Sequence, residues 1–432
     1  MSSRRSPAWS RDFRLHFAAR LFSVLGAQCT YVAVPIVSLL LLPPAQAALV
    51  TASSYLSTLA VGVPAGMLAD RLPRRSIMIG AESVQAAAML GLVLALAGGS
   101  PSLPVLCVLS FVNGSMFAVF GAASAAAVPD LVDRTALTGA LSAMQARDAV
   151  LGVIAPLLGA ALVGVAAWLP FAVAAATFTI ATLLLARIGR PLAPPPDAAD
   201  GAAAAPRRWT HGFRSIIASP VLRGVVAGQM LLSFVLTGTF FTMMAVLAQD
   251  RAVLGAGALT ALMGLGVLAG SAIARGAAGR LSPRSAVLAQ AALWTLCLVA
   301  LAVSPTLLVM IPAITLMWVI VPTARVSLEA WIADHVPSGR RGRLQSVRGV
   351  LNAVASPLGP TACGVLLASG APVAFAALAL AAGIAGVAVL VCGSGRSRRT
   401  GAADASAPSP AAAAGAAGGA GGPGPAGPRR GP

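Results

Sequence analysis

The sequence predicts an all-α integral membrane protein with twelve transmembrane helices, arranged as two pseudo-symmetric six-helix bundles. Of the 432 residues, 58% are hydrophobic and 10% are charged, and the mean hydropathy is +0.86. Water-soluble globular proteins of ordinary composition do not reach these values. Long apolar runs with short connectors predict the spans, and similarity between the two halves of the chain predicts the two bundles.

A transmembrane helix is expected wherever an apolar run reaches the length that crosses a bilayer, about 20 residues. The first run follows Arg4, Arg5, Arg11 and Arg14 and is too long for the core of a signal peptide, so we expect it to be an uncleaved span. The remaining runs follow after short connectors. In chain order the predicted spans are residues 15–42, 47–69, 76–98, 103–128, 139–164, 167–188, 219–247, 253–274, 285–303, 306–331, 344–368 and 371–392.

The connectors alternate in charge along the chain. One set has almost none: residues 43–46, 99–102, 165–166, 248–252, 304–305 and 369–370. The other set, with both termini, holds most of the arginines: residues 70–75, 129–138, 189–218, 275–284 and 332–343. Because basic connectors stay in the cytoplasm, we expect a multi-pass protein of the cell inner (cytoplasmic) membrane with both termini cytoplasmic. The same rule accounts for the net charge of +18, so anionic lipids of the inner leaflet, and not nucleic acid, are the expected partners.

The two halves of the chain resemble each other. Arg75 recurs 209 positions later as Arg284, and "DRLPRR" has a weaker counterpart in "GRLSPR". Pro156 recurs 201 positions later as Pro357. Several such matches in the same order predict six helices plus six, related by an axis along the membrane normal.

The composition between and after the halves predicts two further regions. The linker is rich in Pro and Ala and closes in a basic, aromatic stretch that is expected to lie on the inner leaflet as an amphipathic segment. The low-complexity C-terminal tail is expected to be disordered. The predicted division is therefore residues 1–189 and 219–392 for the bundles, 190–218 for the linker and 393–432 for the tail.

The stretch "GMLADRLPRR" resembles the loop signature of the major facilitator superfamily, and departs from it only at Pro73, where the signature has a second Gly. "RLFSVLGAQ", "VPDLVDRTALTGALSAMQ", "APLLGAALVG" and "SPLGPTACG" resemble the enterobactin-exporter-like branch of that superfamily. The resemblance implies the twelve-helix fold and export of an amphipathic small molecule such as a drug, siderophore or secondary metabolite. The arginine that drug/proton antiporters usually carry in their fourth helix has no counterpart in "SFVNGSMF", so proton exchange is less strongly implied than transport.

The loop signature predicts a conformational gate. Its residues, with one from the second half, are Gly66, Asp70, Arg71, Arg74, Arg75 and Arg348. Gly66 is expected to let helix backbones approach closely, and the arginines to anchor the turn to the inner leaflet. The resemblance implies that Asp70 braces the two halves near residues 342–348, with Arg348 as its ionic partner. The alternative is a solvated loop that only sets topology.

Charged residues inside spans are costly and are therefore candidate functional groups. Those of the first half are Arg20, Glu82, Arg147 and Asp148. Glu82 and Asp148 are either proton-coupling carboxylates or members of static ion pairs with Arg20 or Arg147. In the second half, Arg325 and Glu329 are four residues apart and are expected to form a gating or bracing pair. His16 and His335 are expected near the cytoplasmic surface, which would leave no buried histidine for a proton relay.

Pro and Gly recur at matching places in the predicted helices 5 and 11. Pro156, Gly159, Pro357 and Gly359 are expected to provide hinges or close helix contacts. The alternative is ordinary packing, because membrane helices tolerate these residues.

The predicted function is secondary active transport by alternating access through a central cavity. Its candidate polar residues are Gln28, Asn113, Gln145, Gln229 and Asn352. The sequence has no Gly-rich phosphate loop ending in Lys, and its five cysteines lack metal-ligand spacing, so no enzyme, cofactor or metal site is predicted. The expected partners are the substrate and, if transport is coupled to proton exchange, protons. The protein is expected to be a monomer. The alternatives are a nutrient importer or uniporter, and a non-transporting receptor or scaffold.

Overall fold

A computed structural model describes residues 9–99, 101–133, 135–192, 213–214, 216–250, 252–277, 281–336 and 338–393. The chain divides into two units, Met1–Ser394 and Gly395–Pro432. The second unit, and with it nearly all of the predicted tail, lies outside the described residues, as does linker segment 193–212.

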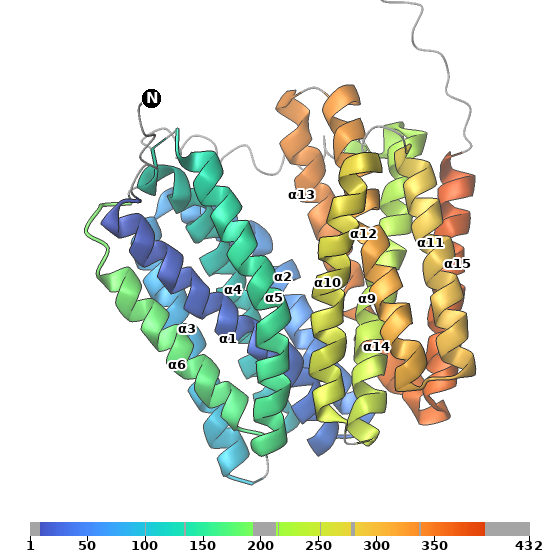
Figure 1. Ribbon diagram of the computed structural model, residues 1–432, viewed down its shortest axis with the longest axis horizontal. Coiled ribbons are helices and arrows are strands. Elements are labelled where there is room, and N and C mark those ends of the chain that lie inside the picture. The colour runs from blue at the N-terminus through green and yellow to red at the C-terminus, as the bar shows by residue number, and fades with distance from the viewer. Residues whose placement is uncertain are drawn as a thin grey trace, which may run out of the picture. The chain divides into compact units, whose positions relative to one another are not determined.

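The first unit is built of long α-helices (Figure 1). They are α1 Arg11–Leu41, α2 Pro44–Arg71, α3 Arg74–Ala97, α4 Leu103–Leu131, α5 Leu137–Val165, α6 Leu169–Ala186, α9 Pro220–Gln249, α10 Val253–Ala277, α11 Pro283–Val303, α12 Leu307–His335, α13 Ser338–Ala355, α14 Leu358–Leu366 and α15 Ala371–Gly393, with a 3₁₀ turn at Leu367–Ser369.

Local sequence sets where several of these helices begin. Ser10, Ser219 and Ser282 precede α1, α9 and α11, and each side-chain oxygen accepts a hydrogen bond from a backbone N–H of the first turn. Such caps satisfy donors that a helix start leaves free. Gly370 lies between the 3₁₀ turn and α15 with a φ of 103°, a conformation that strongly favours glycine.

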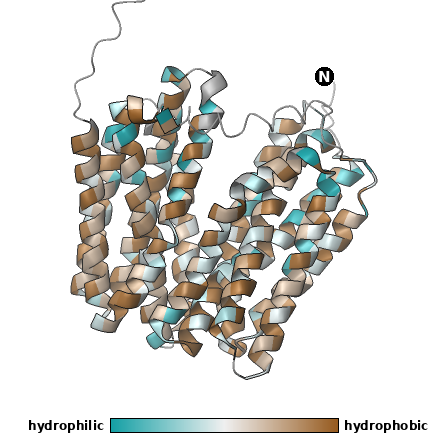
Figure 2. Ribbon diagram, turned by 180° about the vertical axis from the view of Figure 1, so that it is seen from behind, coloured by the Kyte–Doolittle hydropathy of each residue, from teal (hydrophilic) through white to brown (hydrophobic). Residues whose placement is uncertain are grey.

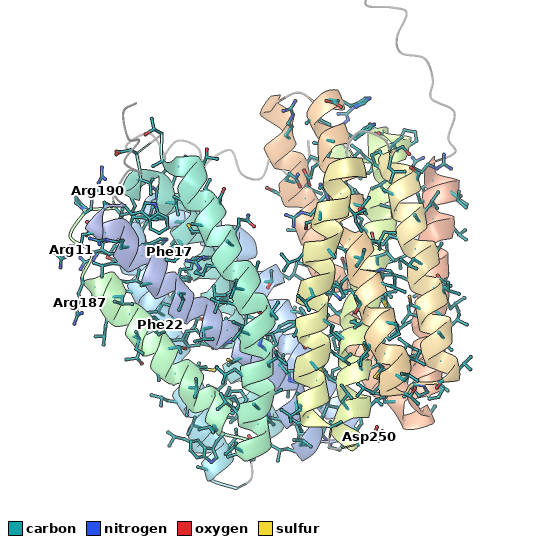
Figure 3. All side chains as sticks on the ribbon, viewed as in Figure 1. Arg11, Phe17, Phe22, Arg187, Arg190 and Asp250 are labelled. Atoms are coloured by element: carbon teal, nitrogen blue, oxygen red, sulfur yellow. The ribbon has the colours of Figure 1, made fainter. Side chains whose placement is uncertain are left out.

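Eleven helical segments of the described residues are long and apolar enough to cross a membrane. The remaining predicted span corresponds to α2, which has 28 residues but is not among those eleven. Figure 2 shows hydrophobic residues along most of the helices, with larger hydrophilic patches toward the end at which α1 begins. Figure 3 places Arg11, Arg187 and Arg190 at that end and Asp250 at the opposite end.

The helix pairings of the first half recur in the second. In the first half, α2 packs on α4, α3 on α4 and α6, and α1 on α5 and α6. In the second half, α10 packs on α12, α11 on α12 and α15, and α9 on α14 and α15. If α13 and α14 together count as the eleventh helix, the two sets correspond one to one. We refer to α1–α6 as the first half and α9–α15 as the second half.

One predicted span is interrupted. The sequence predicts a continuous helix over residues 344–368, but α13 ends at Ala355 and α14 begins at Leu358. Pro357 lies at the break, where it has no N–H to continue the helical hydrogen bonds. The carbonyl oxygen of Ser356 accepts a hydrogen bond from the hydroxyl of Thr237 on α9, at 2.8 Å.

Candidate functional site

A cavity with walls from both halves lies among α1, α2, α4 and α9. Its volume is about 230 Å³, and its lining includes Gln28, Tyr31, Tyr55 and Asn113 of the first half and Phe240 of the second. The rings of Tyr31 and Phe240 stack, with centroids 4.9 Å apart. The phenol groups of Tyr31 and Tyr55 lie beside each other. We call this the tyrosine cavity.

A second cavity, also of about 230 Å³, lies within the second half. Its lining includes Gln229 of α9, Gln290 of α11, Arg325 of α12, and Arg348 and Asn352 of α13. We call it the arginine cavity. Of the five polar residues predicted to line a central cavity, four line one of these two, whereas Gln145 is exposed and lines neither.

An ionic cluster centred on the buried Arg147 joins α1 and α5 in the first half, with Asp148 and Arg20 partly exposed. The Arg147 guanidinium donates to the Asp148 carboxylate at 2.7 Å and to the backbone carbonyl of Phe17 at 3.0 Å. It also lies 4.6 Å from the centroid of the Phe17 ring, which Figure 3 shows on α1. Arg20 approaches the other oxygen of Asp148 at 3.7 Å. Asp148 therefore forms ion pairs with both arginines. This arrangement corresponds to the static ion pair that was one of the two alternatives for Asp148 in the sequence analysis.

Glu82 has a different environment from Asp148. It lies on α3 with no exposed surface, and neither carboxyl oxygen has a hydrogen-bond partner within the described residues. The side chains that face it are Ser23 and Arg20 of α1. Glu82 is thus the buried carboxyl group of this region that is not already in an ion pair.

His16 is buried, contrary to the expectation from sequence. Its side chain has no exposed surface, and Nε2 lies 3.2 Å from the hydroxyl of Ser124 on α4. The prediction failed because the position of His16 near the start of α1 suggested the membrane surface, whereas α4 and the Arg20 side chain cover it. His335 is exposed, as predicted, and stacks on Trp331.

The loop signature is held by the first half itself. Arg74 donates to the Asp130 carboxylate and, at 2.9 Å, to the carbonyl of Ala126 near the end of α4. Arg75 donates to the carbonyls of Leu185 and Ala186 at the end of α6. Its repeat counterpart Arg284 donates to Leu390 O near the end of α15. Arg74 and Arg75 thus bind helix ends of the first half, so protein contacts hold the turn in place, whereas Arg71 is exposed. Contact of these arginines with lipid stays a prediction.

Two further expectations about the gate need correction. A Cβ atom added at Gly66 would meet nothing within 4 Å, so no close helix approach requires glycine there. Arg348 pairs with Glu329 at 3.1 Å and also donates to Gln345 and Gln229. The predicted pair of Glu329 with Arg325 is thus replaced by one that joins α12 to α13, because the carboxylate turns toward the neighbouring helix. The side chain of Asp70 lies outside the described residues, so its contact with residues 342–348 stays a prediction.

Replacement of Arg74 with Gln is expected to lower the free energy of unfolding by about 1–3 kcal/mol, because it removes a hydrogen bond between charged groups and one to a carbonyl at a buried position. The measurement is thermal or denaturant unfolding of the purified protein in detergent. Arg71→Gln is the matched control, since Arg71 is exposed, and should change stability by no more than about 0.5 kcal/mol. Equal losses in the two variants would contradict this role of Arg74.

The halves meet along two glycine-containing contacts. α10 packs on α5 and α14 packs on α2. A Cβ atom added at Gly257 of α10 would lie 2.6 Å from Ala160 Cβ and 3.0 Å from Pro156 O of α5. One added at Gly364 of α14 would lie 2.9 Å from Pro44 O of α2. Ordinary contact begins near 3.4 Å, so these helices approach closely only because the residues are glycines.

The predicted hinge glycines occupy matching contacts within each half. A Cβ atom at Gly159 of α5 would lie 2.6 Å from Cys29 O of α1. One at Gly359 of α14 would lie 2.6 Å from Gly238 N of α9. These glycines therefore permit close packing, whereas of the two prolines only Pro357 lies at a helix break, since Pro156 is inside the continuous α5.

The two tyrosines were not among the residues predicted to form the site. The chain has two tyrosines, and both line the same cavity. Their scarcity in an otherwise aliphatic membrane protein was a usable signal, because a phenol group inside a bilayer needs a polar partner or a wet cavity. Within the described residues, no group of three or more His, Cys, Asp or Glu side chains is placed to hold a metal ion.

Long apolar helices in two similarly packed halves, with cavities whose lining includes several polar side chains, form an arrangement typical of membrane transporters. The family match and the relatives that follow show a transporter and not an enzyme. The chain belongs to the Major Facilitator Superfamily, whose family model matches residues 17–328. It is 30% identical over 235 residues to the enterobactin exporter EntS of Shigella boydii serotype 4 (strain Sb227), and 31% identical over 229 residues to that of Escherichia coli O1:K1 / APEC. Each match covers 49% of this chain, which thereby spans 51% of the relative.

Solved structures share the fold. A crystal structure of the nucleoside transporter NupG matches with a TM-score of 0.71 and 11% identity, covering 88% of this chain and 100% of that one. A bacterial homologue of the iron transporter ferroportin, in an inward-facing state, matches with a TM-score of 0.68 and 18% identity, covering 89% and 99%. At identities this low, the matches show a shared fold and give no information about the substrate.

Proposed function

We propose that this chain is a secondary active transporter of the inner membrane that exports an amphipathic small molecule by alternating access. The observation that carries the proposal is the tyrosine cavity, whose walls come from both halves. A ligand held there contacts both halves, so relative movement of the halves changes its access. The EntS relatives are named exporters, which favours export over the alternative of a nutrient importer or uniporter.

The proposal includes twelve spans with both termini in the cytoplasm, α2 being the second span. The cytoplasmic position of the termini follows from the Arg-rich connectors, because the positive-inside rule places such connectors in the cytoplasm. In this topology the contacts between α5 and α10 and between α2 and α14 lie toward the periplasm. The functional unit is a monomer surrounded by lipid, with the exposed Arg71 available to anionic headgroups.

We further propose that export is coupled to proton entry, with Glu82 as the group that exchanges the proton. Within the described residues Glu82 forms no ion pair that protonation would break. Protonation of Asp148 would weaken its ion pairs with Arg20 and Arg147. This comparison favours Glu82 over Asp148, although the sequence singled out both.

Dye flux in inside-out membrane vesicles tests direction and coupling together. A panel of ethidium, Nile red and carboxyfluorescein samples a cation, a neutral molecule and an anion. We expect at least one dye to accumulate when the lumen is made acidic, and to be released when nigericin collapses the gradient. Vesicles without the protein are the control. Dye accumulation that does not depend on the proton gradient would contradict proton coupling. Dye uptake only in right-side-out vesicles would contradict export.

A further inference from the structure

One face of α9 connects the two cavities. Phe240 lines the tyrosine cavity, and Leu236, Ser233 and Gln229 line the arginine cavity. These positions are four, three and four residues apart, which places them on one side of an α-helix. At 1.5 Å per residue, the stripe from Gln229 to Phe240 is about 16 Å long. The two cavities therefore lie against the same side of α9, one toward each end of this stripe.

The tyrosine cavity suits an uncharged aromatic group. Its described lining holds no Asp, Glu, Arg or His, and it includes two phenols and the Tyr31–Phe240 stack. The Oδ1 atom of Asn113 is buried there without a hydrogen-bond partner in the described residues. A flat ring would stack on the aromatic side chains, and a hydroxyl or amide N–H on it could donate to Asn113.

The arginine cavity suits an anion. Its described lining contains Arg325 and Arg348 but no carboxylate, with amides at Gln229, Gln290 and Asn352. The charge of Arg348 is balanced by Glu329. Arg325 is exposed and, among the described residues, forms no ion pair. A guanidinium in this setting binds a carboxylate or phosphate through paired hydrogen bonds.

We propose that the two cavities are the ends of one binding site for an amphipathic aromatic anion. Its uncharged, hydrogen-bonding ring lies between Tyr31 and Asn113, its body follows the α9 stripe, and its anionic group pairs with Arg325. The proposal rests on the proposed transport function and gives that function a substrate class. The substrate is an anion and not a cation, with an uncharged aromatic ring at one end and the anionic group at the other.

Equilibrium dialysis of the full chain in lipid nanodiscs tests this assignment with a matched pair of probes. One is 4′-hydroxyazobenzene-4-carboxylate, and the other is its primary amide, which has the same ring system and no charge. We expect the wild type to bind the carboxylate about tenfold or more tightly than the amide, as a hydrogen-bonded charge pair provides. Arg325→Gln should remove that preference and leave amide binding unchanged, and Arg325→Lys should retain most of it.

A second substitution examines the other end of the site. Tyr31→Leu should weaken both probes by the same factor, since it removes the ring contact and leaves Arg325 in place. Equal binding of carboxylate and amide by the wild type, no binding of the carboxylate at millimolar concentration, or an Arg325→Gln effect of the same size on both probes would each overturn the proposal. The outcome is separate from transport: gradient-driven flux of ethidium alone supports the proposed function and contradicts the anionic substrate.

Discussion

Replacement of Gly257 with Leu is expected to reduce transport about tenfold or more while leaving the protein folded in the membrane. Gly257 lies on α10 where it packs on α5, and so belongs to a contact between the halves and not to the core of either one. The Cβ atom of the new side chain alone would come within 3.1 Å of atoms of Ala160, Pro156 and Leu157. The rest of a leucine side chain has no space there unless the two helices separate.

The size of the effect follows from packing. Overpacking a close contact costs about 1–3 kcal/mol, and 1.4 kcal/mol changes a population about tenfold. In the proposed alternating-access cycle, the conformation with α5 against α10 is one of two states that must form, so we expect its depletion to slow transport. The measurement is the initial rate of dye accumulation in inside-out vesicles, normalised to the amount of protein.

Gly164→Leu is the matched control for Gly257→Leu. It also places Leu in one of the two helices that form this contact, α5, but a Cβ atom at Gly164 meets nothing within 4 Å. Its transport rate should stay close to that of the wild type. A Gly257→Leu protein that transports at the wild-type rate would show that α5 and α10 need not meet during the cycle, and would refute the proposed role of this contact.

Replacement of Glu82 with Gln is expected to abolish the dependence of transport on the proton gradient. Gln keeps the size of the side chain but holds no exchangeable carboxyl proton, and the loss of charge leaves Arg20 with Asp148 as its ionic partner. The buried position of Glu82 on α3 favours a neutral side chain over a charged one, so the variant should fold. Accumulation of dye against its own gradient should fall to background, while downhill movement of the same dye continues.

Asp148→Asn provides the contrast to Glu82→Gln. It removes the carboxylate shared by Arg20 and Arg147, and leaves the buried Arg147 guanidinium without its anion. We expect a lower unfolding temperature in detergent and less protein in the membrane, with gradient dependence retained by the protein that folds. Retained gradient dependence in Glu82→Gln together with its loss in Asp148→Asn would reverse the two roles.

Periodic features of the chain predicted much of the architecture. Apolar runs located the membrane helices to within a few residues, as at α1, α9 and α15, because hydropathy is a property of each segment on its own. The repeat was also visible: the spacing that matched Arg75 with Arg284 corresponds to equivalent contacts with the ends of α6 and α15. The short loop motif indicated the family, which the family model confirms.

Partnerships between helices were the features that sequence reasoning misassigned. Arg325 and Glu329 share a helix face, yet Glu329 pairs with Arg348 of the next helix. His16 appeared to be at the membrane surface and is buried against Ser124. Gly66 belongs to the loop motif but has open space around it, whereas Gly257, which lies in no quoted motif, and Gly364, the last residue of "SPLGPTACG", occupy the contacts between the halves.

Composition and spacing along the chain determined that this protein is an α-helical membrane protein with a repeated half and arginines concentrated in alternate connectors. Its transport function was indicated by the resemblance of short motifs to a known family, which the family model confirms. Only the tertiary structure decided which carboxylate is paired, which glycines hold the halves together, and that both tyrosines share one cavity with Phe240. The physical reason is that these contacts join residues far apart in sequence, and the rotation and separation of the packed helices select the side chains that meet.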